Sequence, residues 1–178
     1  MDTTLRLKDI FRPMLITLVL LILLEVFSST VMPILGILNY RLPFNILIII
    51  YMGFRVQSST LAIQVLAVQY IHSMFTIEGW GIGTIAGVII CMIISYLREI
   101  VHLSSWPLTI LVTMLFQLVW FIISASMLLI KSVGYAYILD KFWHMLPEGL
   151  VISLMAPLFF ILMDKIWQSN SSDSQGDI

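Results

Sequence analysis

The chain has 178 residues, of which 60% are hydrophobic and 11% charged, and its formal net charge is −1. Soluble domains carry roughly 25% charged residues, so this composition excludes an ordinary soluble domain and indicates a protein surrounded by lipid. The near-zero net charge gives no electrostatic basis for binding nucleic acid. The single cysteine, Cys91, excludes an internal disulfide framework.

The long apolar runs predict α-helices, because barrel strands would alternate apolar and polar residues with period two. Prolines open four of these runs: Pro13, Pro43, Pro107 and Pro147. Proline suits the first turn of a helix, where its missing N–H would lack a partner anyway. The predicted fold class is all-α, a polytopic integral membrane protein of about six transmembrane helices with short loops.

The first span is expected at residues 13–38. Basic residues precede it, as in a signal peptide, but the run is too long and lacks a small-x-small cleavage site, so we expect it to stay uncleaved. The second apolar run, residues 43–54, is too short to cross an average bilayer unaided. It either crosses with its ends covered by neighbouring helices or is re-entrant.

Four further spans are expected, at residues 60–77, 82–97, 106–130 and 147–167. Residues 131–146 form the one sizeable loop, and its aromatic residues suit a short interfacial helix at the level of the lipid headgroups. Residues 1–167 are therefore expected to form a single transmembrane domain. The polar residues 168–178 are expected to form a disordered cytoplasmic tail.

The distribution of basic residues predicts the orientation of the chain. With six spans, six of the nine Lys and Arg residues fall on the side of the N-terminus and three on the other side. The side richer in Lys and Arg is normally cytoplasmic, so both termini are predicted to lie in the cytoplasm. A re-entrant second segment would move the C-terminus to the other side.

Glu25 lies near the middle of the first expected span. An ionised carboxylate there costs about 2.5–3.5 kcal/mol on insertion scales. Glu25 is therefore a candidate for a buried contact with a partner helix or a bound polar group. The alternative is a protonated or internally hydrogen-bonded carboxyl that only fixes helix packing.

Gln69 and His72 are three residues apart and share one face of the third expected span. They could line a ligand or proton path, although interhelical hydrogen bonding is the simpler interpretation. Gln117 lies on a face of the fifth span that is expected to point into the bundle. Gly83 and Gly87 form a GxxxG pair, for which packing within the chain is favoured over dimerisation.

Catalytic, cofactor and metal sites are not predicted. The three histidines fall in three different segments, and the sequence has no metal-ligand spacing. The serine pairs lack the context of a nucleophile. The glycine-rich residues 79–87 do not follow the dinucleotide-binding spacing.

The chain resembles the rod shape-determining MreD family of bacteria. The resemblance rests on the proline-led run Pro43-Phe44-Asn45-Ile46-Leu47-Ile48-Ile49-Ile50-Tyr51-Met52-Gly53, the glycine turn Glu78-Gly79-Trp80-Gly81-Ile82-Gly83 and the final Met163-Asp164-Lys165-Ile166-Trp167. Family members commonly carry an aspartate at the end of the third span, whereas this chain has Tyr70-Ile71-His72-Ser73-Met74 there. For this reason no family site residue is carried over.

The resemblance implies a six-span protein of the bacterial inner membrane that acts in the cell-elongation machinery. It would be a non-catalytic scaffold that binds the membrane-anchored coiled-coil protein MreC, beside MreB filaments and the peptidoglycan synthases of the rod complex. The family fold is similar to the substrate-binding subunits of vitamin transporters.

Two other functions remain open. The chain could be a small-solute-binding subunit of a transporter, with a polar pocket built from Glu25, Gln69, His72 and Gln117. It could also be an intramembrane enzyme acting on a lipid-linked substrate, although a plausible acid/base pair is lacking.

Overall fold

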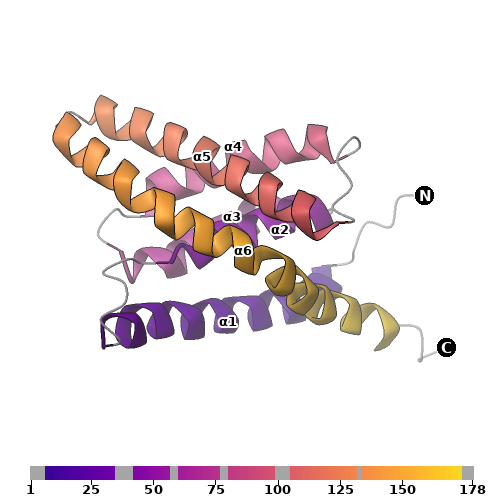
Figure 1. Ribbon diagram of the computed structural model, residues 1–178. Coiled ribbons are helices and arrows are strands. Elements are labelled where there is room, and N and C mark those ends of the chain that lie inside the picture. Colours follow the sequence, from indigo (N-terminus) through magenta and orange to yellow (C-terminus); the bar gives the residue numbers. More distant parts are fainter. Residues whose placement is uncertain are drawn as a thin grey trace.

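The computed structural model is a bundle of α-helices (Figure 1). It describes residues 7–34, 42–56, 60–76, 80–98, 105–131 and 134–173, with side chains for 10–30, 42–56, 60–76, 80–98, 105–131 and 134–167. The helices are α1 (Leu7–Ile34), α2 (Phe44–Arg55), α3 (Leu61–Ser73), α4 (Trp80–Leu97), α5 (Trp106–Ile130) and α6 (Tyr135–Asp173). The prediction of an all-α fold is confirmed for these residues.

Successive helices run back and forth along the bundle, so α1 begins and α6 ends at the same end, on the right in Figure 1. The first half of α6 packs beside α5, and its second half crosses to α1. There the indole Nε1 of Trp167 donates a hydrogen bond of 3.3 Å to Thr17 Oγ1. The two ends of the described chain therefore share one end of the bundle.

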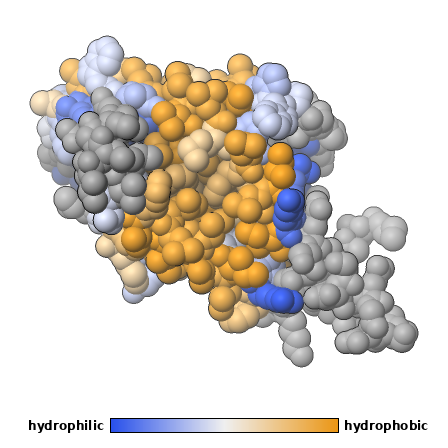
Figure 2. Space-filling model, turned by 60° about the horizontal axis from the view of Figure 1, so that its bottom comes forward, coloured by the Kyte–Doolittle hydropathy of each residue, from blue (hydrophilic) through white to orange (hydrophobic). Residues whose placement is uncertain are grey.

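Four segments are long and apolar enough to cross a membrane: Ile10–Thr30, Trp80–Leu97, Trp106–Ile130 and Tyr135–Trp167. Helices α2 and α3 are shorter, with 12 and 13 residues. Figure 2 shows a broad apolar surface flanked by hydrophilic residues toward the two ends of the bundle. The apolar helices and this belt indicate an integral membrane protein.

Helix α2 is the centre of the core. Every residue from Phe44 to Gly53 is buried, and α2 contacts all five other helices. The ring of Tyr51 meets that of Phe160 edge-on, with centroids 5.5 Å apart. A helix that is apolar on all sides is expected in such a position. At 12 residues, α2 is only about 18 Å long.

Two of the four proline predictions are confirmed and two are wrong. Pro43 caps the start of α2, and Pro107 lies in the first turn of α5. By contrast, α1 begins at Leu7, before Pro13, and Pro147 lies inside α6. A membrane helix tolerates an internal proline because neighbouring groups can satisfy the freed backbone carbonyl. Proline is therefore a weaker boundary signal here than in a soluble protein.

The expected loop at residues 131–146 is also wrong, because α6 already begins at Tyr135. Helix α6 has 39 residues, which corresponds to about 58 Å, whereas the hydrocarbon layer is about 30 Å thick. It therefore extends beyond the hydrocarbon layer. Its last residue, Asp173, lies within the segment expected to be a disordered tail, and residues 174–178 are outside the described part of the chain.

Gly83 and Gly87 pack within the chain. A Cβ atom on Gly83 would overlap the amide oxygen of Gln69, and one on Gly87 would lie 2.7 Å from the side chain of Val65. Both neighbours belong to α3, so the GxxxG pair brings α4 close to α3. The preference for packing within the chain over dimerisation agrees with these contacts.

Candidate ligand-binding cavity

Buried Glu25 of α1 pairs with the partly buried His72 of α3. The His72 Nδ1 atom lies 2.6 Å from Glu25 Oε1, and the side chains are 17% and 0% exposed. Both residues were singled out in the sequence, but they are 47 positions apart and nothing in the spacing paired them. The imidazole gives the carboxyl the polar partner that a buried carboxyl requires.

Gln69 joins α3 to α2. Its amide oxygen accepts a hydrogen bond of 3.5 Å from Asn45 Nδ2, and both side chains are buried. The missing side chain of Gly83 on α4 leaves the space for the Gln69 amide. Sequence reasoning did not select Asn45, although an amide within an otherwise apolar run next to Pro43 was an available signal.

Gln117 joins α5 to α6 in a similar way. Its Nε2 donates a hydrogen bond of 3.1 Å to Ser153 Oγ, and both residues are buried. A Cβ atom on Gly149 would lie 2.8 Å from Gln117 Oε1, so a glycine at this position of α6 admits the amide. The face of Gln117 points into the bundle, as the sequence predicts.

One cavity of about 350 Å³ lies beside these polar residues, among α2, α3, α5 and α6. Asn45, His72 and Gln117 line it directly. Gln69 and Glu25 do not line the cavity. Gln69 contacts the lining residue Asn45, and Glu25 contacts the lining residue His72. Two of the four polar residues selected from the sequence, His72 and Gln117, therefore line this cavity, which we call the polar cavity.

Helix α6 supplies the charged wall of the polar cavity. Asp140, Lys141, His144 and Glu148 recur at helical spacing and line it. The His144 Nδ1 atom lies 2.9 Å from the backbone carbonyl oxygen of Asp140 and 3.7 Å from its carboxylate. Asp140, Lys141 and His144 were not selected because residues 131–146 were expected to form a loop outside the bundle, and Glu148 was not selected within the expected span at residues 147–167.

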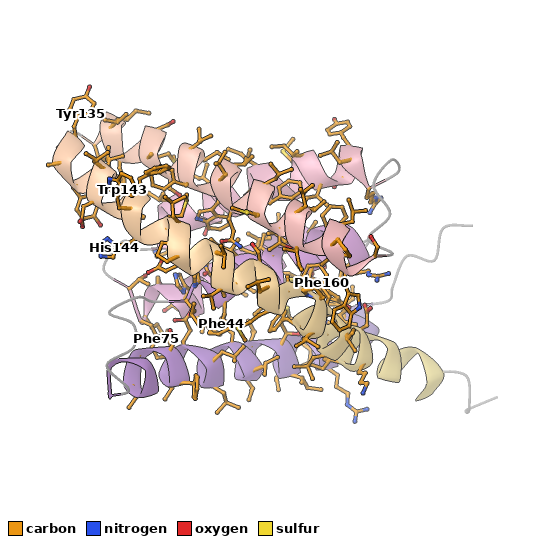
Figure 3. The ribbon with its side chains drawn as sticks, viewed as in Figure 1. Phe44, Phe75, Tyr135, Trp143, His144 and Phe160 are labelled. Carbon is orange, nitrogen blue, oxygen red and sulfur yellow. The ribbon has the colours of Figure 1, made fainter. Side chains whose placement is uncertain are left out.

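Aromatic side chains form the rest of the wall. Trp120 and Phe121 come from α5 and Tyr137 from α6. The ring of Phe121 also packs on Phe142 of α6, with centroids 5.5 Å apart. Figure 3 shows His144 projecting from α6 at the end of the bundle where Phe75 follows α3, whereas Phe160 lies toward the other end. The polar cavity is therefore an end feature of the bundle.

A separate polar cluster lies toward the other end of the bundle. The Tyr51 hydroxyl donates a hydrogen bond of 2.9 Å to Asp164 Oδ1, and Arg55 Nη2 lies 3.4 Å from Asp164 Oδ2. These contacts tie the end of α2 to α6. We interpret this cluster as structural, because Tyr51, Arg55 and Asp164 each contact another side chain of the cluster.

The polar cavity can bind through hydrogen bonds, charge and aromatic contact. Among the described residues, no group of three or more His, Cys, Asp or Glu side chains could hold a metal ion. Comparison of the chain with family models, curated proteins and solved structures found no match.

Proposed function

We propose that this chain is a non-catalytic scaffold of the bacterial inner membrane, of the MreD type, that binds a membrane-anchored coiled-coil partner resembling MreC. In this role it would help to control cell shape and peptidoglycan synthesis within the rod complex. The resemblance over residues 43–97 supports the assignment. With α2 and α3 counted as spans, the chain would cross six times with both termini in the cytoplasm, which agrees with the excess of basic residues on that side.

The observation that carries the proposal is the central position of α2. Every residue from Phe44 to Gly53 is buried, so a partner protein would contact the outer helices rather than α2. The first turns of α6 offer one face for such contact, since Tyr135, Leu139 and Trp143 are all more than half exposed there. Aromatic side chains of this kind suit contact with a partner at the headgroup level.

Photo-crosslinking in living cells tests the proposal. A photoreactive residue would replace Leu139 or Trp143 on α6, or Leu23 on α1, and Met92 on α4 would serve as an equally exposed control. We expect at least one of the first three positions to capture a membrane-anchored coiled-coil protein, with a lower yield from the control. Capture of no such protein, or equal yields from all positions, would contradict the scaffold.

A second candidate function is that of a small-solute-binding subunit of a transporter. The convergence of Asn45, His72 and Gln117 on the polar cavity favours it. Protein purified from its native membrane would then carry a small molecule that mass spectrometry detects after denaturation. That molecule, added back, would raise the melting temperature. Protein that carries none, together with crosslinking to a coiled-coil partner, would leave the scaffold alone.

A further inference from the structure

We propose that the first part of α6 is a lid that opens and closes the polar cavity by pivoting at Pro147. We call this part, residues 135–146, the α6 arm; it is the orange end of α6 in Figure 1. The inference goes beyond the scaffold role and does not depend on it. It rests on a proline at the junction, a change of burial at the same point, and cavities on two sides of the arm.

The junction is marked by Pro147, which lies inside α6. Proline has no N–H, so the backbone carbonyl of Trp143, four residues earlier, lacks its usual donor within the helix, and the proline ring crowds that turn. Sharp bends in long helices are found mostly at internal prolines. The helical hydrogen bonding of α6 is therefore interrupted where the arm joins the rest of the helix.

The burial of α6 changes at the same point. None of the residues 135–148, all of which the structure describes, is buried. From Gly149 onwards buried side chains recur along the helix, among them Ile152, Phe160 and Met163. The part of α6 after Pro147 is therefore anchored in the bundle, whereas the arm lies on the surface of the bundle.

Cavities lie on two sides of the arm. The polar cavity separates it from α3, and within the described ranges α6 contacts α1, α2 and α5 but not α3. A second cavity of about 420 Å³ lies between the arm and α5, lined by Phe121 of α5 and by Leu139, Phe142 and three other residues of the arm. The aromatic contact between Phe121 and Phe142 holds the arm against α5. The arm therefore has space on both sides into which it can move.

The arm is held by contacts that a lid could break and remake. Tyr137, Lys141 and His144 each have interactions of their own, but the arm has no buried apolar side chain to pack into the core. Segments with few buried apolar contacts open most readily. A pivot of about 20°, as at a proline kink, would move Leu139 by about 4 Å, since it lies eight residues, or about 12 Å, before the proline.

Distances between pairs of spin labels in nanodiscs measure this motion. Cys91→Ala removes the native thiol, and Ile63→Cys on α3 provides a common reference site. The second label would be placed at Leu139→Cys on the arm or at Leu158→Cys on the anchored part, and all three labelled positions are more than half exposed. We expect a broad distribution for the Leu139 pair, with a component displaced by about 4 Å, and a narrow one for the Leu158 pair.

The two prolines inside α6 provide matched variants. Pro147→Ala restores the N–H that can donate to the Trp143 carbonyl, which would hold the arm in line with the rest of the helix. Pro157→Ala makes the same change within the anchored part, where Pro157 is itself buried. We expect Pro147→Ala to narrow the distance distribution of the Leu139 pair and Pro157→Ala to leave it unchanged.

Reaction of a thiol inside the polar cavity tests whether the motion opens it. Ser124 lines the cavity and is 3% exposed, so Ser124→Cys in the Cys91→Ala background would place one thiol there. We expect N-ethylmaleimide to modify this thiol, at least about threefold more slowly when Pro147→Ala is added and at an unchanged rate with Pro157→Ala. The wild-type chain is the control for general unfolding, since Cys91 is buried and lines neither cavity.

The proposal is supported if the Leu139 pair gives the broader distribution and Pro147→Ala alone slows the thiol reaction. Distributions of equal width for the Leu139 and Leu158 pairs would overturn it. Equal reaction rates of the Ser124→Cys thiol in the two proline variants would overturn it as well. If Pro147→Ala fails to fold, the comparison of the two label pairs without it still decides. The crosslinking result of the scaffold proposal is independent of these outcomes.

Discussion

The contact between Glu25 and His72 predicts how much free energy of unfolding is lost when either side chain is removed. Glu25 is fully buried and its Oε1 lies 2.6 Å from His72 Nδ1, so removing either side chain breaks this contact inside the bundle. Breaking a buried pair in this way costs about 3 kcal/mol or more when the pair is ionic. Hydrogen bonds between membrane helices contribute about 0.6 kcal/mol on average and about 1.7 kcal/mol at most.

A double-mutant cycle distinguishes a strongly coupled pair from an ordinary hydrogen bond between membrane helices. Glu25→Ala, His72→Ala and the double variant would be unfolded reversibly in mixed micelles, and the free energies of unfolding compared. We expect each single variant to lose about 3 kcal/mol, with a coupling energy above about 1.5 kcal/mol because the contact is short and polar. Ser126→Ala, on the exposed side of α5, is the control and should add to His72→Ala within about 0.5 kcal/mol. A Glu25–His72 coupling no larger than that of this control would refute the reasoning.

Three further predictions concern the contact of α4 with α3, the hydrogen bond between Tyr51 and Asp164, and the orientation of the chain. Gly83→Ala places a methyl group against the side-chain amide oxygen of Gln69 on α3 and should lower the free energy of unfolding by about 1–3 kcal/mol. The control, Gly81→Ala, has open space around it and should leave the free energy of unfolding nearly unchanged. Tyr51→Phe removes the hydrogen bond to Asp164 and should cost about 1 kcal/mol, and an unchanged melting temperature would contradict the contact. A reporter fused after Ser172 should be active only in the cytoplasm, and activity outside would exclude the predicted orientation.

The sequence predicted the helices better than their ends. Residues 106–130 were expected as a span and coincide with α5, because Pro107 and a polar stretch before it define its start. Pro147 was wrongly expected to begin a helix, because a membrane helix tolerates an internal proline that would break a soluble helix. The error carried over to residues 131–146, where the aromatic residues suit both an interfacial loop and the first turns of a long helix.

The candidate site was predictable only in part, since two of its lining residues, His72 and Gln117, were selected from the sequence. Polar side chains in apolar runs selected Glu25, Gln69, His72 and Gln117, since such groups are costly in lipid and must find partners. Their partners come from segments 24 to 47 positions away, and no local pattern encodes those separations. Three residues of the charged wall, Asp140, Lys141 and His144, lie in the segment expected as a loop, and this wrong prediction is the reason they were not selected.

Membrane integration is the claim on which the whole account depends, and alkaline carbonate extraction followed by purification tests it most directly. Four long apolar helices with exposed apolar faces predict that the chain stays in the membrane pellet and needs detergent to remain monodisperse. A chain released by carbonate, folded and monodisperse in detergent-free buffer, would contradict the account.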